Sequence, residues 1–246
     1  MSPHFDDGVL SLGGLMAKRE HKLEVATFFT KRPTEIIHTN WDKISGFSDS
    51  DEAVLARTKE NKKALIPFGA IIKNYDYPDF QYRKTNENQI IRENIIKNIQ
   101  SIIENNKNRE LYIYGPATFG EKITHPDHQI MHDALMGVIK ENTQTNTHFF
   151  IYEDFPYVRQ FALAQMGSLN TYLKEKENIE FKELPIELNK TELSEKVSSI
   201  HKYISQVKAF LSFGDNIGNL AQKFYQERCK NIHPMFYACE VVNMIP

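Results

Sequence analysis

Residues 2–29 read SPHFDDGVLSLGGLMAKREHKLEVATFF, and this run decides the fold. Its middle, residues 9–19, is rich in small and apolar side chains and predicts a buried helix. Residues 23–29 follow as a strand. A helix that leads directly into a strand is the repeating unit of an α/β sheet. The polar group His4, Asp6 and Asp7 stands just before the helix, where a preceding strand would end.

The same alternation continues along the chain. Apolar periodicity and capping residues predict helices at residues 48–65, 88–105 and 127–140, and strands at residues 70–75, 111–114 and 147–153. These elements predict a mostly parallel sheet flanked by helices. Beyond residue 160 the pattern changes to a C-terminal α+β extension, with a hairpin or irregular strand pair at 171–188, helices at 194–213 and 219–229, and a last strand at 236–242. No linker divides the chain, so we expect a single domain over residues 1–246.

Composition excludes several classes of function. The 246 residues include 32 acidic and 30 basic side chains, a net charge of -2, which argues against a nucleic-acid partner. The longest apolar stretch, residues 64–72, is far short of the roughly 20 residues that span a bilayer. No signal peptide is visible, and Cys229 and Cys239 suggest no disulfide framework. We therefore expect a cytoplasmic protein without a membrane span, and the sequence leaves a homo-oligomer open.

The start of the chain departs from the usual pattern. Only Met1, Ser2 and Pro3 precede His4, fewer than the roughly 5 residues of a typical strand. We therefore expect the first strand of the sheet to be truncated.

Two clusters of polar residues stand at predicted strand ends. His4, Asp6 and Asp7 offer an imidazole and two carboxylates within four residues, and these are donor types that zinc takes. His125 and His128 bracket Asp127 after the strand at 111–114. Because sites in open α/β sheets form at the carboxyl ends of strands, the two loops can converge. Asp6 and Asp7 taken alone are equally consistent with charges at a helix N-terminus.

These two clusters resemble the hallmarks of the LmbE-like, or PIG-L-like, N-acetylglucosaminyl deacetylases. Residues 2–7, SPHFDD, match the family's opening motif, and residues 125–128, HPDH, match its second motif. Weaker similarities lie at residues 57–60 (RTKE), 152–157 (YEDFPY) and 202–206 (KYISQ). Departures are Gly8, where many members have Glu, and Ile123, where some have Tyr.

The resemblance implies a Rossmann-like fold and a Zn²⁺-dependent hydrolase that removes acetyl from an N-acetylated amino sugar or glycoconjugate. By position in the family's motifs, His4, Asp7 and His128 would hold the metal. Asp6 would be the general base toward a zinc-bound water, His125 would stabilise the oxyanion or deliver a proton, and Asp127 would orient His125. Arg57 would contact the sugar or a phosphate, although its charged helix could equally present it to solvent.

Two other functions remain open at this point. One is a catalytically silent carbohydrate-binding protein on the same fold, although all six motif positions are intact. The other is an amidase that acts on a non-sugar metabolite, because fold and metal site do not fix the substrate.

Overall fold

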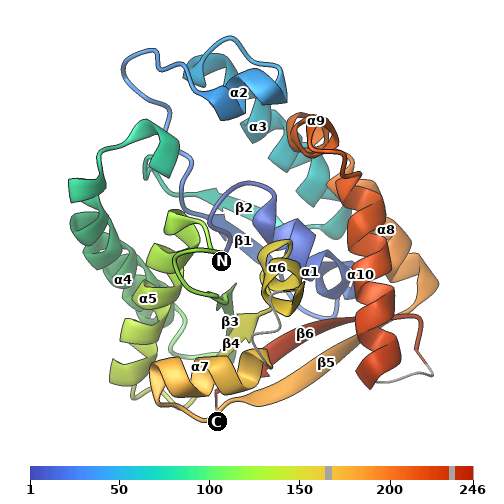
Figure 1. Cartoon of the computed structure of the whole chain (residues 1–246). Coiled ribbons are helices and arrows are strands. Elements are labelled where there is room, and N and C mark those ends of the chain that lie inside the picture. The colour runs from blue at the N-terminus through green and yellow to red at the C-terminus, as the bar shows by residue number, and fades with distance from the viewer. Residues whose placement is uncertain (164–167, 233–235, 246) are drawn as a thin grey trace. The chain divides into compact units, whose positions relative to one another are not determined.

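The computed structural model describes residues 1–163, 168–232 and 236–245 (Figure 1). The chain separates into two compact units. The first unit comprises Ser2–Arg83 and Pro185–Glu240, and the second comprises Met1, Lys84–Leu184 and Val241–Pro246. Each unit is described by itself, and the single domain expected over residues 1–246 stays a prediction.

The first unit contains the N-terminal motif together with three C-terminal helices. In chain order its elements are α1 (Asp7–Lys18), β1 (Glu24–Thr27), α2 (Asn40–Ser45), α3 (Ser50–Leu65), η1 (Ile66–Phe68), β2 (Ile71–Asn74), η2 (Phe80–Tyr82), α8 (Lys190–Ile200), α9 (Ile204–Ser212) and α10 (Ile217–Ile232). Strands β1 and β2 pair in parallel, with Val25 opposite Ile72. The predicted helix that begins after Asp49 is confirmed, since the Asp49 carboxylate accepts hydrogen bonds from two backbone N–H groups of α3.

Helix α1 is buried on nearly every face, and two glycines make this packing feasible. A Cβ on Gly14 would lie 2.3 Å from the Leu188 side chain, and one on Gly13 would lie 2.8 Å from Lys196. The Glu240 carboxylate accepts the Gly14 and Leu15 N–H groups, at 2.7 and 2.8 Å, just after the helix departs from helical geometry at Leu12. Glu240 therefore satisfies backbone donors that the kink leaves without helical acceptors.

A buried ion pair completes this contact. The Lys196 Nζ donates to Glu240 Oε1 at 2.6 Å and to the Ser11 carbonyl, and it lies 3.4 Å from the centre of the Tyr225 ring. Burial lowers the pKa of Lys196 to about 8, although Glu240 favours the charged form. The pair links α8 and β6 to α1, the helix that follows the metal-capable motif.

The second unit is built on a sheet. Its elements are η3 (Thr85–Glu87), α4 (Asn88–Asn105), β3 (Leu111–Pro116), α5 (Pro126–Glu141), β4 (Thr147–Tyr152), α6 (Tyr157–Leu163) and α7 (Leu169–Glu177). Strands β5 (Lys182–Leu188) and β6 (Ala238–Met244) each begin in one unit and end in the other. The four-stranded sheet has the order β3-β4-β6-β5, with β3 parallel and β6 antiparallel to β4. Helix α4 confirms the helix predicted there, with four isoleucines buried at four-residue spacing, namely Ile91, Ile95, Ile99 and Ile103.

The predicted α/β class is confirmed, and two local predictions are wrong. Residues 171–188 form α7 and β5 rather than a strand pair, because Leu169, Leu173 and Glu177 lie four residues apart and make one buried helical face. Residues 194–213 form two helices, α8 and α9, rather than one. The break contains Tyr203, whose buried hydroxyl donates to Asn61 of α3.

The cysteines also differ from expectation. Cys229 of α10 and Cys239 of β6, both buried, form a disulfide, although the sequence suggested no disulfide framework. Their pairing depends on α10 and β6 lying together, which their spacing in the sequence does not reveal. Among the described residues, no helix has the length and hydropathy needed to cross a membrane. A cytoplasmic location stays a prediction, and it has to accommodate a disulfide of a kind that is rare there.

The buried carboxylate of Glu177 in the second unit has a pKa that its hydrogen-bond partners lower. Its carboxylate lies 3.3 Å from His132 Nε2 and accepts from Lys140 Nζ at 3.1 Å. The hydrogen bond with His132 is the main reason that the pKa of Glu177 falls from 4.5 to about 2. Since the folded state lowers this pKa, the carboxylate stabilises the protein above about pH 4.5, and that stability is lost as the pH falls through about 2.

We expect Glu177→Gln to lower the free energy of unfolding by about 2 kcal/mol at pH 7, because a charged hydrogen bond is lost. The difference from wild type should shrink between about pH 4.5 and pH 2.5 in urea titrations, as the carboxylate becomes protonated in the unfolded chain. Glu180→Gln, at a side chain that is 71% exposed, is the matched control and should change little. A difference that stays constant over this pH range would contradict the assignment.

Candidate active site

Backbone hydrogen bonds hold the His4 loop against β1. Ser2 N–H donates to the Ala26 carbonyl at 2.8 Å, and Phe28 N–H donates to the Ser2 carbonyl at 3.1 Å, which makes a parallel bridge between Ser2 and Thr27. The Ser2 hydroxyl accepts from Gly8 N–H at 2.9 Å. The few residues before the motif thus pair with β1 as a strand residue would, and they turn the chain into α1.

The first unit brings His4 and Asp7 together, as the metal-ligand prediction requires. Asp7 Oδ2 accepts the His4 backbone N–H at 2.7 Å and lies 3.2 Å from His4 Nδ1. The other ring nitrogen, Nε2, lies 3.9 Å from a carboxylate oxygen of Asp79. Sequence reasoning missed Asp79, since it stands outside any motif at ligand spacing and only the fold brings it to His4.

Asp6 has the environment of a general base. It is only 8% exposed, and burial together with the adjacent Asp7 raises its pKa from 3.8 to about 7. The charges of His4 and Arg57 oppose this rise. A carboxyl group whose pKa lies near neutrality can both accept and release a proton at physiological pH.

Arg57 lies in α3 with its guanidinium buried, not in solvent. Its Nη2 lies 2.9 Å from Asp42 Oδ1 and donates to Ser45 Oγ at 3.3 Å, and its side chain is 7% exposed. Tyr82 donates to the other Asp42 oxygen at 2.7 Å. Asp42 therefore neutralises Arg57 and ties α2 to α3, while the positive charge still favours ionised Asp6. No motif in the sequence indicates Asp42 as the partner of Arg57.

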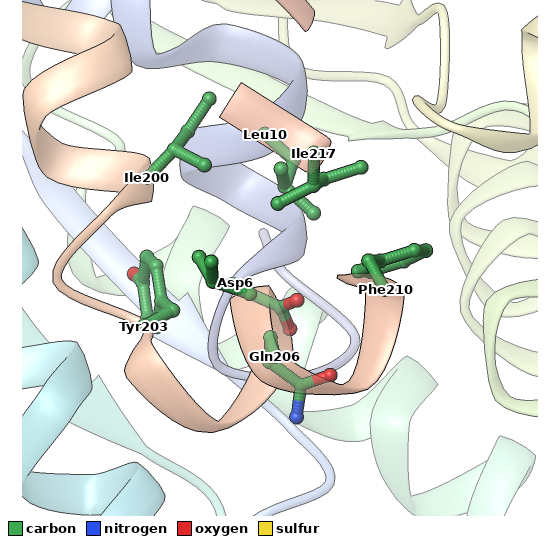
Figure 2. Close-up of a pocket in the computed structure, with 8 residues that line it drawn as sticks. Asp6, Leu10, Ile200, Tyr203, Gln206, Phe210 and Ile217 are labelled. Carbon is green, nitrogen blue, oxygen red and sulfur yellow. The ribbon is translucent and has the colours of Figure 1, made fainter. Parts of the chain in front are cut away.

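Helices α3 and α9 are joined by side chains from two of the weaker motifs. Glu60 accepts the Ser205 N–H at 2.9 Å and the Ser205 hydroxyl at 2.6 Å, which caps the first turn of α9. Tyr203 donates to Asn61 at 3.0 Å. These bonds place Gln206 beside Asp6, as Figure 2 shows.

In the second unit, His125 caps α5. Its Nδ1 accepts the Asp127 backbone N–H at 3.2 Å, while the Asp127 carboxylate lies 3.8 Å from the same nitrogen, beyond hydrogen-bond distance. The backbone N–H of Asp127, rather than its carboxylate, therefore engages this ring nitrogen. With Nδ1 acting as an acceptor, the proton of a neutral His125 is on Nε2.

His128 is oriented by a buried carboxylate. Its Nδ1 lies 2.5 Å from Asp154 Oδ2, both side chains are fully buried, and the Tyr157 ring packs edge-on at 5.0 Å. With Nδ1 bound to Asp154, Nε2 is the nitrogen that a metal ion would take. A ligand nitrogen of His125 lies within 4.8 Å of one from His128. The motif at residues 152–157 contains Asp154, but the sequence gives no sign that Asp154 contacts His128.

The predicted site residues divide between the two units. His4, Asp6, Asp7 and Arg57 belong to the first, and His125, Asp127 and His128 belong to the second. Each unit groups metal-capable side chains, and a joint site made by both sets stays a prediction.

Comparison with known proteins gives a family and a fold. The model of the PIG-L family, described as GlcNAc-PI de-N-acetylase, matches residues 1–139. No curated protein matches the sequence. The zinc-inhibited form of teicoplanin deacetylase Orf2 is similar in structure, with a TM-score of 0.77 and 22% identity over 100% of this chain and 96% of that one.

Two further solved structures are more distant. N,N'-diacetylchitobiose deacetylase from Pyrococcus horikoshii has a TM-score of 0.62 and 14% identity over 100% of this chain and 82% of that one. GalB, the 4-carboxy-2-hydroxymuconate hydratase from Pseudomonas putida KT2440, has a TM-score of 0.63 and 12% identity over 100% and 94%. At these identities the likeness establishes the fold alone, and a hydratase on the same fold means that the fold does not determine the reaction.

The buried pair of Arg57 and Asp42 can be tested directly. Asp42→Asn should lower the free energy of unfolding by about 3 kcal/mol or more, because it leaves a buried guanidinium without its counter-charge. Urea unfolding at pH 7 measures this loss.

Asp133→Asn is the matched control, since it removes one partner of a 3.4 Å pair with Lys176 whose Asp133 side chain is 45% exposed. Its effect should stay below about 1 kcal/mol. Equal losses in the two variants would show that Arg57 does not depend on Asp42.

Proposed function

The chain belongs to the PIG-L family, whose model is described as GlcNAc-PI de-N-acetylase, and from this premise we propose that it removes the acetyl group from an N-acetylated amino sugar. Family membership makes it a hydrolytic N-deacetylase by class, as predicted. The teicoplanin and diacetylchitobiose deacetylases support a sugar or glycoconjugate as the substrate. The observation that carries the proposal is the buried Asp6 carboxyl beside the His4–Asp7 pair, with its pKa near 7.

We propose that His4, Asp7 and His128 hold a zinc ion. Two imidazole nitrogens and one carboxylate oxygen are a donor set that suits catalytic zinc, with further positions left for water or substrate. The contact of Asp154 with His128 fits this role, since metal-binding histidines commonly donate their second nitrogen to a carboxylate. When bound, the ion would acidify water and polarise the amide carbonyl.

The chain's own residues then have separate roles. Asp6 would take a proton from the attacking water, whose oxygen forms the new bond to the acyl carbon. As the carbon–nitrogen bond breaks, the leaving amine takes a proton from Asp6 or from His125. The Nε2–H of His125 would also donate a hydrogen bond that stabilises charge on the former carbonyl oxygen. Asp127 would keep His125 in place through the backbone N–H that His125 Nδ1 accepts.

Arg57 requires a modified role. The family motif predicts a contact of Arg57 with the sugar, and that contact stays a prediction. The buried pair with Asp42 supports a different use, in which Arg57 holds α2 and favours the ionised form of Asp6.

Asp6→Asn tests the proposed base. We expect amine release from N-acetylated sugars to fall about 10²- to 10⁴-fold, because the base is lost, while the bound metal is retained. Amine release should be assayed on N-acetylglucosamine, its glycosides and diacetylchitobiose, after loading with zinc or other divalent ions, with metal content measured in parallel. Asp133→Asn is the control. Stoichiometric metal with no amine release from any acetamide would refute the deacetylase proposal.

Asp154→Asn tests the support of the metal site. Loss of the carboxylate beside His128 should weaken zinc affinity about 10- to 100-fold in chelator competition. His128→Ala gives the reference for loss of a ligand, and Asp133→Asn controls for a lost surface charge. Unchanged zinc affinity in Asp154→Asn would mean that His128 is no ligand or needs no orientation.

A further inference from the structure

Exposed apolar side chains gather on helix α9 and the turn that follows it in the first unit. Ile204 is 64% exposed, Leu211 is 50% exposed and Phe213 is 62% exposed. Ile204 and Leu211 lie seven residues apart on one side of α9, and the exposed Lys208 stands between them on the same side. Phe213 stacks on Trp41 of α2 at 6.2 Å. Large apolar side chains that gather on a surface in this way mark an interaction site.

Helix α3 lies beside α9 and repeats this pattern (Figure 1). The Glu60 carboxylate accepts the backbone N–H and the hydroxyl of Ser205, so the two helices are joined side by side. Apolar and basic side chains also alternate on the exposed side of α3, every three or four residues, at Leu55, Lys59, Lys62 and Ile66. The exposed sides of the two helices, with Trp41 and Phe213, are called the α3–α9 face.

The charge on the α3–α9 face is positive. In residues 53–66 and 200–214, the exposed charged side chains are all lysines, namely Lys59, Lys62, Lys63, Lys202 and Lys208. Glu60 is the single carboxylate in these two segments, and Ser205 binds it. Carboxylates border the segments at Glu52, which accepts the Ser48 N–H, and at Asp215, which is half-buried. Since the whole chain has a net charge of -2, this face concentrates positive charge locally.

The combination of lysine with large apolar side chains identifies the occupant. A nucleic acid would neutralise the lysines but leave the apolar side chains in water. The core of a protein interface is depleted in lysine, which is strongly hydrated. An anionic membrane suits both kinds of side chain. Apolar groups enter the boundary between headgroups and acyl chains, while lysine stems extend along it and their ammonium groups reach the lipid phosphates.

We propose that the α3–α9 face binds the surface of a membrane that contains anionic lipids. Helix α9 has nine residues, so it would lie in the plane of the interface rather than cross it. The proposal does not depend on the deacetylase reaction. It concerns the outer side of α9, whereas Gln206 on the inner side is the residue that lies beside Asp6.

Vesicle sedimentation tests this proposal. The full chain is mixed with vesicles of phosphatidylcholine alone, or of phosphatidylcholine with about one third phosphatidylglycerol. We expect binding to the anionic vesicles to be about tenfold or more tighter, and to weaken as the ionic strength rises from about 0.01 M to about 0.15 M. No binding to anionic vesicles, or equal binding to both kinds, would overturn the proposal.

Variants locate the binding to the face. Leu211→Ser combined with Phe213→Ser should weaken binding to anionic vesicles about tenfold or more, because two apolar groups no longer enter the interface. Lys202→Gln combined with Lys208→Gln should weaken it about fivefold per lysine. Both substitutions in each pair are at exposed positions, and thermal unfolding checks that the fold is kept.

Helix α4 of the second unit supplies the matched controls. Ile90, which is 52% exposed, is replaced by Ser, and the exposed Lys97 is replaced by Gln. Both controls should bind the anionic vesicles as the wild type does. If the variants of the α3–α9 face bind no more weakly than these controls, the lipid surface lies elsewhere and the proposal is wrong.

Two other occupants would give different results. Concentration-dependent dimers that Leu211→Ser with Phe213→Ser abolishes, without vesicle binding, would assign the face to a second copy of the chain. Binding of duplex DNA or RNA that only the lysine variant weakens, again without vesicle binding, would assign it to nucleic acid. Either result overturns the membrane proposal. None of these measurements requires amine release, so the deacetylase proposal stands or fails separately.

Discussion

The whole site in the first unit depends on a short backbone pairing at the start of the chain. The parallel bridge between Ser2 and Thr27, with the hydrogen bonds of Ser2 to Ala26 and Phe28, fixes the position of the backbone that leads into His4. Ser2 makes a single bridge to β1, and this pairing orients the motif because the Ser2 hydroxyl also holds the first turn of α1 through Gly8. The metal-capable loop is thus positioned largely by main-chain bonds, which do not depend on the identity of its side chains.

This placement buries two adjacent carboxyl groups, and charged residues of the surrounding helices adjust the pKa of one of them. Asp6 and Asp7 are adjacent, buried carboxyl groups, and the loss of water and the repulsion between them both favour a protonated Asp6. The charges of His4 and Arg57 lower the pKa of Asp6, and the ion pair with Asp42 keeps the Arg57 guanidinium buried. The result is a carboxyl group poised near neutral pH. Two neighbouring residues of α3, Glu60 and Asn61, then hold α9 over Asp6 by hydrogen bonds.

Much of this could be predicted because it is local in sequence. Helix periodicity locates α4, and the motifs at residues 2–7 and 125–128 suggest candidate ligands through their resemblance to a known family, a ligand set that stays a prediction. What could not be predicted depends on contacts between distant segments. Asp42 meets Arg57, Asp154 meets His128, and Cys229 meets Cys239 only after folding. The break between α8 and α9 also depends on a distant contact, because Tyr203, which lies in this break, donates a hydrogen bond to Asn61 of α3.

The proposed base and the C-terminal helices beside it come from different parts of the chain. The proposed base and metal ligands lie within residues 1–139, the segment that the family model matches. The C-terminal helices near Asp6, which carry Ile200, Phe210 and Ile217, lie beyond it. Helix α3 holds α9 through the bonds of Glu60 with Ser205 and of Asn61 with Tyr203, so the exposed face of α9 is free of this role. A fold arranged in this way can keep one proposed hydrolytic centre while the outer side chains of its C-terminal helices vary.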